Sequence, residues 1–505
     1  MSAGSPATFV STAPRDGRVL GSYPLHRAEE VAARVAAARA AAPAWVALGH
    51  RGRAARLDAW RRLILRRSRE LVELISAETG KTTSDARLEV LLVATHLRWA
   101  ARNAGRVLRR RPVAPGPLMF HHTAAVEHLP LGVVGVIGPW NHPAFIPIGP
   151  VAAALAAGNT VVLKPSEHAP AVGSWLVDAF AEATGARDAL RIVHGDGDTG
   201  AALCRSGVDK IAFTGSTETG RRVMAACAET LTPVVLECGG KDAVIVDRDV
   251  DPAAVAEAVV WGGLANAGQT CVGVERVYVH EAVADRFLAE VVAHAAGLRV
   301  GTGPDAHLGP MATSAQPEVV LEHVRDALRR GGRALLGGPE AVDSSLVAPI
   351  VLTDVPEDAL VMTRETFGPV LVVNRVATAA EAVERANSGP YGLGAAVFSR
   401  SRGPALAAGL RVGMVSVNSV LGFAGVPGLP FGGTGASGFG RVHGPEGLRE
   451  FTHTRATARQ WLRPPVTPQS FRTSPRTLGA LLGLVRLGHG AGFPDRRRRR
   501  RKADR

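Results

Sequence analysis

The stretch Thr160-Val161-Val162-Leu163-Lys164-Pro165-Ser166-Glu167 decides the fold class of this 505-residue chain. Its first four residues predict a short buried strand, and the helical run before it ends at Gly158-Asn159, a pair that suits a helix C-terminus. Around this stretch we expect a helix at 171–183 and strands at 190–194, at 210–213 and within 124–137. Strands that alternate with helices of this length predict a parallel sheet with crossover helices.

The same alternation begins again after Val234-Val235-Leu236. The pattern predicts strands at 243–246, 276–279 and 370–373, and helices at 253–265, 282–296 and 317–330. The fold class is therefore predicted to be α/β, with two doubly wound α/β domains, the second of which starts near Glu237. A cleft between two such domains is a usual place for an active site.

Composition indicates a globular protein. Charged residues make up 21% of the chain and the apolar set 46%, which are ordinary values. Four scattered cysteines give no disulfide framework, and without a CxxC pair we predict no metal site and a reducing, cytoplasmic compartment. The N-terminus lacks the pattern of a signal peptide, and no stretch reaches the roughly 20 apolar residues of a membrane-spanning helix.

The net charge of +14 is unevenly placed, because residues 495–505 hold eight basic and two acidic residues. One interpretation of this segment is a solvated, disordered tail. The other is attraction to anionic lipid or to nucleic acid, and no specific nucleic-acid partner is expected. Just upstream, one helical face carries Leu478, Leu481, Leu482 and Val485. Such a segment either makes a peripheral contact with a membrane or docks on the protein itself.

Lys164 and Glu167 follow a strand at its carboxyl end, where parallel sheets bind ligands. Only five residues of the chain are lysine, so a lysine retained inside a motif carries extra weight. Lys164 can donate to sugar hydroxyls, and Glu167 can accept from them. Glu167 would also repel a 2′-phosphate, which favours NAD over NADP, while a plain polar loop is the alternative reading.

The run from Gly215 to Gly220 follows a predicted strand and opens a helix. Glycine lets backbone amides approach a phosphate, and a helix N-terminus favours an anion, although an ordinary N-capped helix has the same pattern. Upstream, the run from Gly195 to Gly200 matches GxGxxG. Its two aspartates would repel a pyrophosphate, so we predict a turn there.

Cys271, within Gly268-Gln269-Thr270-Cys271, differs from the other three cysteines in its setting. Flexible backbone and polar neighbours could expose and activate its thiol, whereas a small buried hydrophobe is the alternative. Asn141, within Pro139-Trp140-Asn141-His142-Pro143, can offer a side-chain N–H to a developing oxyanion, and a proline-bracketed turn is the alternative there. We expect His142 to have a supporting or structural role.

Together these motifs resemble the aldehyde dehydrogenase superfamily, from about residue 25 to about residue 460. Lys81, in Glu78-Thr79-Gly80-Lys81, fits the family as well, and seven motifs in the family's order are very specific. The seven are Pro139-Trp140-Asn141, Lys164-Pro165-Ser166-Glu167, Phe213-Thr214-Gly215-Ser216, Leu236-Glu237-Cys238-Gly239-Gly240-Lys241, Gly268-Gln269-Thr270-Cys271, Glu365-Thr366-Phe367-Gly368-Pro369 and Pro430-Phe431-Gly432-Gly433.

The resemblance implies oxidation of an aldehyde to a carboxylic acid with NAD, or with NADP, as the cofactor. Cys271 would add to the aldehyde as a thiohemiacetal and then carry a thioester, while Asn141 and the backbone N–H of Cys271 hold the oxyanion. Glu237 would activate the water that hydrolyses the thioester. The implied cofactor-binding residues are Trp140, Lys164, Ser166, Glu167, Gly215, Ser216, Gly220, Glu365 and Phe367.

The resemblance also divides the chain and implies a homodimer or homotetramer. Residues 1–236 would form a Rossmann-like NAD(P)-binding domain with an oligomerisation hairpin near 117–130, and residues 237–424 a catalytic thiol domain. Residues 425–462 would return to the cofactor domain and supply oligomerisation strands. Residues 463–505 would form a C-terminal extension with the amphipathic segment and the basic tail.

Several positions depart from the common family pattern. Cys238 replaces a leucine, His142 replaces an aromatic residue, and Gly435 replaces a lysine found in many members. The run from Gly440 to Gly447 is similar to the branch of class-3-like and bacterial semialdehyde enzymes. Substrate identity therefore stays open between succinic semialdehyde and a fatty or aromatic aldehyde oxidised at a membrane.

Two rival functions are less well supported. A CoA-acylating enzyme would cleave the thioester with a thiol and typically lacks the general-base glutamate, so Glu237 argues against it. A catalytically idle scaffold that binds a membrane or nucleic acid would not need Cys271, Glu237 and Asn141 together.

Overall fold

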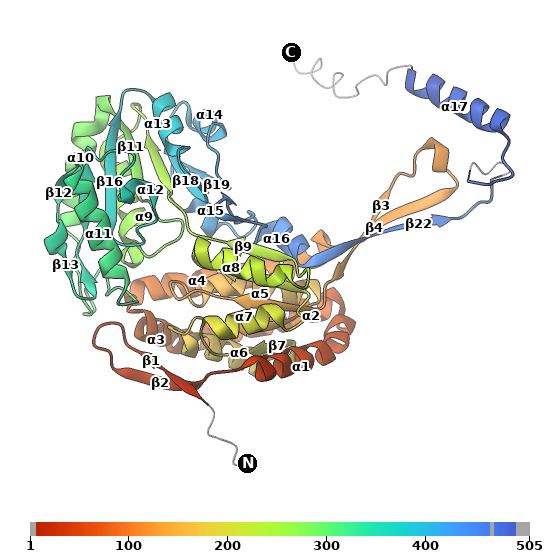
Figure 1. Ribbon diagram of the computed structural model, residues 1–505, viewed down its shortest axis with the longest axis horizontal. Helices are drawn as coiled ribbons and strands as arrows, with labels where there is room; N and C mark the ends of the chain where they lie inside the picture. Colours follow the sequence, from red (N-terminus) through yellow and green to blue (C-terminus); the bar gives the residue numbers. More distant parts are fainter. Residues whose placement is uncertain (1–6, 465–468, 491–505) are drawn as a thin grey trace. The chain divides into compact units, whose positions relative to one another are not determined.

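The computed structural model describes residues 7–464 and 469–490, which form two compact units (Figure 1). The first unit comprises the described residues up to Arg109 together with His128–Thr454. The second comprises Arg110–Glu127 and the described residues from Arg455 onward. Both predicted sheets lie in the first unit, so the proposed domain boundaries at residues 236 and 424 stay a prediction.

A six-stranded sheet with the order β21-β9-β8-β5-β6-β7 contains the first predicted alternation. All neighbours are parallel except β21, which runs antiparallel to β9. Its strands are β5 (Val133–Ile137), β6 (Thr160–Lys164), β7 (Leu190–Ile192), β8 (Lys210–Thr214), β9 (Val234–Glu237) and β21 (Gly438–Phe439). The order reverses direction at β5, and such a switch point is where open α/β sheets bind ligands.

Helices cover both faces of this sheet, so its central strands are buried on both sides. Alternate residues of β5 enter opposite cores: Val134 and Val136 pack with α2 to α6, whereas Val133 and Ile137 pack with α1, α7 and α8. These helices are α1 (Ala28–Ala47), α2 (Gly49–Arg66), α3 (Ser68–Thr79), α4 (Thr83–Val107), α5 (Phe145–Ala157), α6 (Pro170–Thr184), α7 (Gly197–Arg205) and α8 (Thr217–Ala228).

A seven-stranded sheet with the order β12-β15-β16-β11-β10-β18-β19 contains the second alternation. Only its edge strand β12 is antiparallel. Its strands are β10 (Ala243–Val246), β11 (Arg276–His280), β12 (Arg333–Leu336), β15 (Ile350–Thr353), β16 (Val370–Val376), β18 (Gly394–Phe398) and β19 (Met414–Val417). One face is covered by α9 (Pro252–Leu264) and α10 (Glu281–Ala296). The other face is covered by α11 (Gln316–Arg329), α12 (Leu360–Thr363) and α13 (Ala379–Ala386).

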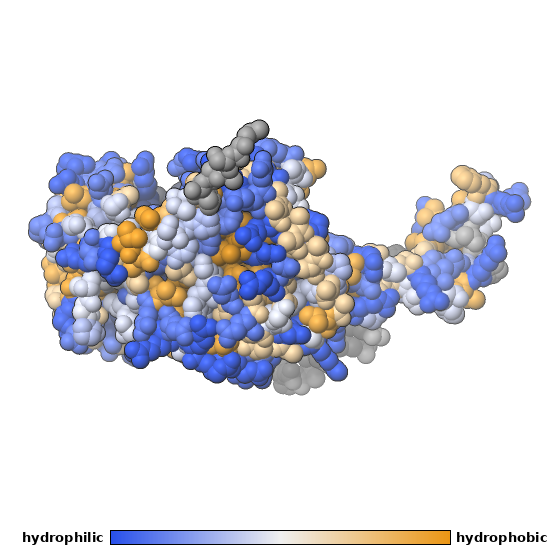
Figure 2. Space-filling model, turned by 90° about the horizontal axis from the view of Figure 1, so that it is seen from below, coloured by the Kyte–Doolittle hydropathy of each residue, from blue (hydrophilic) through white to orange (hydrophobic). Residues whose placement is uncertain are grey.

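The first unit also contains short strands and α-helices outside these two sheets. They are β1 (Thr8–Thr12), β2 (Val19–Pro24), β13 (Val342–Asp343), β14 (Leu346–Val347), β17 (Tyr391–Gly392), β20 (Thr434–Gly435), α14 (Gly403–Ala408), α15 (Gly422–Gly425) and α16 (Gly444–Glu450). Hydrophilic residues cover much of the face seen in Figure 2, with apolar residues gathered in smaller patches.

The second unit is built on a three-stranded sheet with the order β22-β4-β3. It contains β3 (Arg111–Val113), most of β4 (His122–Pro130), most of β22 (Thr452–Gln460) and the helix α17 (Pro475–Gly490). The predicted amphipathic segment is therefore helical, and the predicted hairpin begins earlier, at Arg111.

The predicted α/β class and the strand and helix positions are confirmed. One hairpin was missed, and one local prediction needs correction. The antiparallel β1–β2 hairpin was not predicted, and Gly195 to Gly200 is more than a turn, because α7 starts at Gly197 with the Asp196 side chain as its N-cap. The basic run at 496–502 lies outside the described residues.

No single helix among the described residues is long and apolar enough to cross a membrane. Together, α1 and α2 have the length and apolar composition of a membrane span, but the pair is bent by 113°.

Candidate active site

Four predicted motifs meet at one edge of the six-stranded sheet. Lys164 ends β6, the Asn141 loop follows β5, the Gly215 loop follows β8, and Glu237 ends β9. These parallel strands are neighbours in the order β9-β8-β5-β6, so their carboxyl ends share one edge. The structure therefore brings together motifs that are far apart in sequence.

Lys164 and Glu167 lie beside each other after β6. The ammonium of Lys164 donates to the carbonyl oxygen of Pro165 at 3.1 Å and lies 3.6 Å from Glu167 Oε2. Burial lowers the pKa of Lys164, although the carboxylate of Glu167 opposes that shift. Ser166 Oγ accepts the backbone N–H of His168, which fixes the loop. A polar pair of this kind, one partner buried and one half-exposed, can hold the hydroxyls of a sugar.

The loop after β8 forms the start of α8. Ser216 is the N-cap, and its hydroxyl accepts the backbone N–H of Thr219 at 3.2 Å. A Cβ at Gly215 would lie 2.6 Å from the Phe213 ring, and a Cβ at Gly220 would lie 2.7 Å from Cys238 Sγ. Close packing thus explains both glycines, and the N-terminus of α8 still offers backbone amides to an anion.

Cys271 lies at the amino-terminal edge of the seven-stranded sheet, in the loop before β11, whereas the four motifs above lie at the carboxyl edge of the six-stranded sheet. The backbone reaches it through three consecutive left-handed residues, Asn266, Ala267 and Gly268, with φ of 56°, 53° and 72°. A Cβ at Gly268 would lie 2.1 Å from the carbonyl oxygen of Gly368, so only glycine fits there. Such strain persists where the surrounding structure imposes it, as it does at many active sites.

Asn141 is buried and its side chain is tied to the Cys271 loop. Its Nδ2 donates to the carbonyl oxygen of Gln269 at 3.0 Å. Asn266 Nδ2 donates to the same oxygen and to the carbonyl oxygen of Asn141. Gln269 Oε1 in turn accepts the backbone N–H of Ala312 at 2.8 Å. One N–H of the Asn141 amide is thus committed to the loop, and the amide has a second N–H to offer.

Glu237 ends β9 with a carboxyl group that is buried and only half satisfied. Thr214 Oγ1 donates to Oε2 at 3.3 Å, while Oε1 has no hydrogen-bond partner. Burial raises the pKa of Glu237 to about 8. The pKa of the Cys271 thiol is also raised, first by burial and then by the negative charges of Glu237 and Glu365. The thiol and the two carboxyls therefore share one electrostatic environment.

The loop after Glu237 passes beneath both Cys271 and Glu365. A Cβ at Gly240 would lie 2.8 Å from the carbonyl oxygen of Cys271, and one at Gly239 would lie 2.1 Å from Glu365 Oε2. The backbone N–H of Gly240 donates to Glu365 Oε1 at 3.1 Å. Burial raises the pKa of Glu365 to about 8. The two glycines are required because the segments approach so closely.

Phe367 connects the two edges. Its φ is 52°, a left-handed value that a phenylalanine rarely adopts. Its ring meets Trp140 edge to face, with centroids 5.5 Å apart. A cavity of about 870 Å³ opens here, lined by Trp140, Glu167, His168, residues 312–318 and the β1–β2 hairpin among others. Two predicted cofactor-binding residues thus line one cavity.

The chain matches known proteins along nearly its whole length. The model of the aldehyde dehydrogenase family matches residues 1–457. The chain is 39% identical over 468 residues to 4,4'-diapolycopene aldehyde oxidase from Methylomonas sp., which covers 92% of this chain and 88% of that protein. It is 34% identical over 450 residues to glutarate-semialdehyde dehydrogenase from Pseudomonas putida, covering 88% and 92%.

This chain belongs to the aldehyde dehydrogenase family. Among solved structures, an NAD-dependent aldehyde dehydrogenase from Sinorhizobium meliloti superposes with a TM-score of 0.88, at 33% identity over 94% of both chains. PnpE in complex with nicotinamide adenine dinucleotide superposes with a TM-score of 0.85, at 34% identity over 90% of this chain and 94% of PnpE. The protein is an NAD(P)-dependent aldehyde oxidoreductase, as the motifs predicted.

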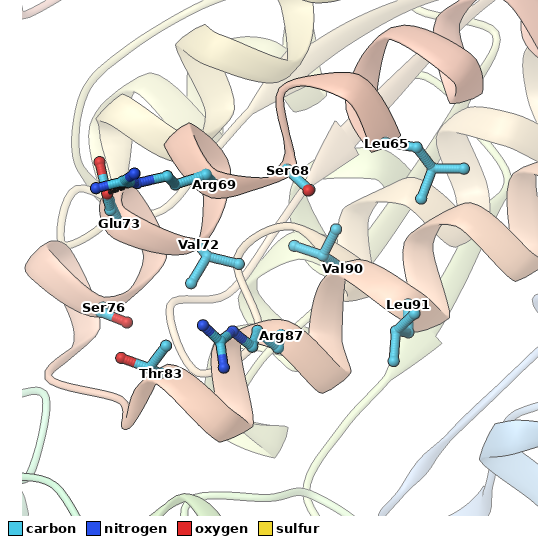
Figure 3. A pocket seen from close by; sticks show the side chains of 10 residues that line it. All are labelled: Leu65, Ser68, Arg69, Val72, Glu73, Ser76, Thr83, Arg87, Val90 and Leu91. Atoms are coloured by element: carbon cyan, nitrogen blue, oxygen red, sulfur yellow. Dashed lines mark hydrogen bonds and ion pairs between the residues drawn. The ribbon is translucent and has the colours of Figure 1, made fainter. Parts of the chain in front are cut away.

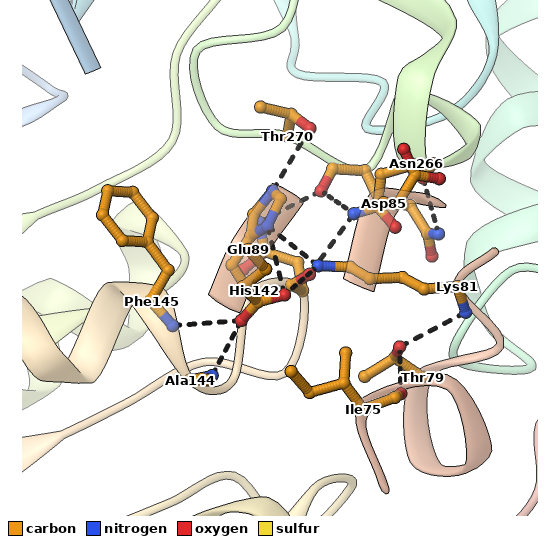
Figure 4. A network of polar contacts seen from close by, with 12 residues as sticks. Ile75, Thr79, Lys81, Asp85, Glu89, His142, Ala144, Phe145, Asn266 and Thr270 are labelled. Atoms are coloured by element: carbon orange, nitrogen blue, oxygen red, sulfur yellow. Dashed lines mark hydrogen bonds and ion pairs between the residues drawn. The ribbon is translucent and has the colours of Figure 1, made fainter. Parts of the chain in front are cut away.

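A buried polar network supports the site of this aldehyde dehydrogenase (Figure 4). Lys81 pairs with Glu89, and its Nζ lies 2.8 Å from His142 Nδ1. Glu89 Oε1 accepts the backbone N–H of Ala144 and of Phe145, the start of α5. His142 was predicted to be a supporting residue, and Lys81 was placed by motif, but Glu89 was missed because a lone glutamate in a helical pattern carries no signal.

A second network of the same kind holds the Phe367 loop. Lys241 pairs with Glu275, and its Nζ donates to Thr366 Oγ1 at 3.1 Å. Glu275 accepts the backbone N–H groups of Thr366 and Phe367. His323 Nδ1 lies 3.1 Å from Thr366 Oγ1. Glu275 and His323 were also missed from the sequence, whereas Lys241 lies in a recognised motif.

Aromatic rings gather in the core against which Cys271 packs. His96 and His443 have centroids 4.1 Å apart, and the rings of Phe145 and Phe431 lie 5.6 Å and 5.7 Å from His443. Burial lowers the pKa of His96 to about 4 and that of His443 well below its usual value, so both rings are neutral. A Cβ at Gly149 would lie 2.6 Å from His443 Nε2, which explains the glycine.

A further cavity of about 870 Å³ lies over α2, α3 and α4 of the dehydrogenase (Figure 3). Its lining includes Leu65, Arg69, Glu73 and Arg87. None of its lining residues belongs to the predicted site, so this groove is separate from the thiol.

Proposed function

We propose that Cys271 is the nucleophile, Glu237 the deacylation base and Asn141 the oxyanion donor of this aldehyde dehydrogenase. After its thiol proton has passed to water, the Cys271 sulfur adds to the aldehyde carbon. The new oxyanion accepts hydrogen bonds from the second N–H of Asn141 and the backbone N–H of Cys271. A preorganised donor of this kind is typically worth about 10² to 10³ in rate. A bound NAD(P)+ would supply the acceptor for the hydride of the aldehyde carbon, and Cys271 would then carry a thioester.

The observation that carries the proposal is the buried, unpartnered Oε1 of Glu237. A carboxyl oxygen without a partner in an apolar setting is free to accept a proton from a water molecule that attacks the thioester. Because burial raises its pKa to about 8, Glu237 is a stronger base than an ordinary carboxylate. The neighbouring Cys238 is buried at the Gly220 contact, which supports a packing role.

The residues around the cofactor region fit an NAD(P) molecule. Glu365 rests against Gly239, Lys164 and Glu167 can hold the adenosine ribose, and Ser166 fixes their loop. The start of α8, with Gly215, Ser216 and Gly220, would meet the pyrophosphate, and Trp140 and Phe367 would border the nicotinamide. We expect NAD to be preferred, because Glu167 would repel the 2′-phosphate of NADP.

For the substrate we favour an apolar aldehyde over a semialdehyde that carries a carboxylate. The rings of Phe145 and Phe431 belong to the core against which Cys271 packs, and the neutral rings of His96 and His443 contact them. None of these four rings offers a cation to a carboxylate. The relatives' names contain both kinds of substrate. The Methylomonas relative is named for 4,4'-diapolycopene aldehyde, and other relatives are named for succinate or glutarate semialdehyde.

For assembly we propose a homodimer or homotetramer built through the sheet β22-β4-β3. β22 is an edge strand of nine residues, none of them buried, and an exposed edge of this length is a template for pairing. We also propose that the C-terminal extension makes a peripheral contact with a membrane.

Replacing Glu237 by glutamine tests the mechanism. Glu237→Gln should keep the rapid first-turnover burst of NADH, while steady-state turnover falls by about a hundredfold or more, because only hydrolysis needs the base. In the wild type, deacylation-limited turnover should rise with pH through an apparent pKa of about 8. The assay is stopped-flow absorbance of NADH, run with NAD and with NADP.

Cys271→Ala is the matched control, and it should lose both phases. An equal loss of burst and steady state in Glu237→Gln would show that Glu237 is not the deacylation base. Normal turnover in Cys271→Ala would rule out the covalent mechanism.

A further inference from the structure

We propose that the groove over α2, α3 and α4 binds an amphiphilic carboxylate, with the carboxylate at Arg87 and the acyl chain along Leu65 and Leu91 (Figure 3). This site is distinct from the one that oxidises the aldehyde. The proposal rests on the proposed function in one respect only, because an apolar aldehyde would yield an acid of this class.

The groove has the size of a small-molecule site. Its volume is about 870 Å³, within the roughly 300–1,000 Å³ that is usual for such sites. Its walls come from the end of α2, from α3 and from the first half of α4. Such sites are lined mainly by apolar side chains with a few polar groups that fix the orientation of the ligand, and both kinds are present here.

One end of the groove is polar. Figure 3 shows the side chains of Ser76, Thr83 and Arg87 turned toward one another there. Arg87 forms no hydrogen bond or ion pair with any residue that the structure describes. Ser76 Oγ is buried and has no hydrogen-bond partner in the described parts of the chain, and a buried polar atom of this kind is costly until it is satisfied. A guanidinium beside two hydroxyls is a suitable set of donors for a carboxylate.

The charges that line the groove favour an anion. Arg69 Nε pairs with Glu73 Oε1 at 2.8 Å, so these two residues compensate each other. Arg87 is then left without a counter-charge, and the lining has a net charge of +1 from two arginines and one glutamate. A single carboxylate complements this charge, whereas a cation would meet repulsion from Arg87.

The other end of the groove is apolar. Val72 and Val90 line it from the core, since they are 8% and 3% exposed. Leu65 and Leu91 line it at the surface, where they are 39% and 60% exposed. Along α4, Thr83 and Leu91 lie about 12 Å apart at about 1.5 Å per residue. An acyl chain that starts at the polar end would therefore cover both exposed leucines and remove apolar surface from water.

The helix α4 separates the groove from the active site. At about 100° per residue, Arg87 and Leu91 each lie about 160° around the helix from Glu89. Glu89 pairs with Lys81 and accepts the backbone N–H of Ala144, on the side of the active site. A ligand in the groove would therefore contact α3 and α4 without reaching the thiol.

Isothermal titration calorimetry of the full-length enzyme tests the proposal. The probes are sodium octanoate, 1-octanol, which has a similar chain without the carboxylate, and sodium acetate, which has the carboxylate without the chain. We expect octanoate to bind, and 1-octanol and acetate to bind at least about tenfold more weakly, because each lacks one half of the ligand.

Two variants separate the two ends of the groove. Arg87→Gln removes the charge and should weaken octanoate binding by about tenfold or more. Leu65→Gln with Leu91→Gln removes the apolar end and should weaken it as well, while glutamine keeps a good helix propensity. Arg98→Gln is the matched control, because Arg98 is exposed on the same helix and does not line the groove.

Oxidation of propanal with NAD is measured in every variant. Unchanged turnover with weakened octanoate binding in Arg87→Gln supports the proposal, whereas absence of turnover in the wild type would contradict the proposed function alone. Equal octanoate binding by Arg87→Gln and the wild type would overturn the proposal, because that binding would then belong to the active site. So would a wild type that binds no octanoate while the double leucine variant dissociates into smaller species by light scattering, since a second copy would then cover the groove.

Discussion

Two buried lysine–glutamate pairs support the active site from different sides, and they do different work. Lys81–Glu89 holds the loop that carries Asn141, whereas Lys241–Glu275 holds the loop that carries Phe367. In each pair the glutamate also accepts two backbone N–H groups, and a histidine lies close by. A buried ion pair is stabilising only when such additional bonds satisfy it.

The difference between the pairs lies in what their glutamates fix. Glu89 accepts the first N–H groups of α5, so it stabilises an ordinary helix start. Although burial opposes ionisation, Lys81 and His142 together lower the pKa of Glu89 to about 2. Glu275 instead holds Phe367 in a left-handed conformation, which would otherwise be strained. One pair maintains the scaffold, and the other maintains a strained loop in the proposed cofactor region.

The largest expected effect is the loss of the first pair. Glu89→Gln leaves the buried ammonium of Lys81 without its counter-charge, so the free energy of unfolding should fall by about 3–5 kcal/mol. Urea unfolding followed by tryptophan fluorescence measures this change. Glu73→Gln, which removes a surface pair with the 92% exposed Arg69, should change stability little or not at all. Equal losses of unfolding free energy for the two substitutions would mean that the Lys81–Glu89 pair contributes no more to stability than a surface pair.

A smaller effect should distinguish the second pair. Thr366→Val removes the hydroxyl between Lys241 and His323 at nearly constant volume, and it should cost about 1–3 kcal/mol of stability. Because Thr366 adjoins Phe367 and Glu365, the KM for NAD should rise while the burst with saturating NAD persists. Steady-state kinetics with NAD as the varied substrate checks this. An unchanged KM would show that the second pair does not position the cofactor region.

The smallest effect concerns pH and the histidine of the second pair. Burial and the charge of Lys241 lower the pKa of His323 to about 4, so His323 stays neutral in the folded protein while the unfolded chain takes up a proton below about 6.5. The stability it contributes is therefore present above pH 6.5 and is lost as pH falls from 6.5 toward 4. His323→Asn should reduce the stability loss between pH 7.5 and pH 5 by about 1–2 kcal/mol.

Urea unfolding at the two pH values measures that loss. The matched control is His453→Asn, because His453 is exposed in β22. If both histidine variants behave alike, another group dominates the acid sensitivity.

The parallel sheets were predictable because each strand is short, apolar and followed by a helix of suitable length. The motif residues Lys164, Glu237 and Cys271 were predictable because unusual polar residues follow such strands or glycine runs. The β1–β2 hairpin was not predictable, since its residues are mostly exposed and show no apolar alternation. Glu89 and Glu275 could not be recognised either, because their role depends on lysines and amides contributed by distant segments.

The sequence by itself determined the fold class, the family and the reaction. Local patterns suffice for these, because strand and helix periodicity and glycine-rich loops are written in consecutive residues. Only the tertiary structure decided that Cys271 approaches from the amino edge of one sheet while Glu237 and Asn141 approach from the carboxyl edge of another. It also raised the pKa of Glu237 to about 8, since burial depends on what the rest of the chain packs around a residue.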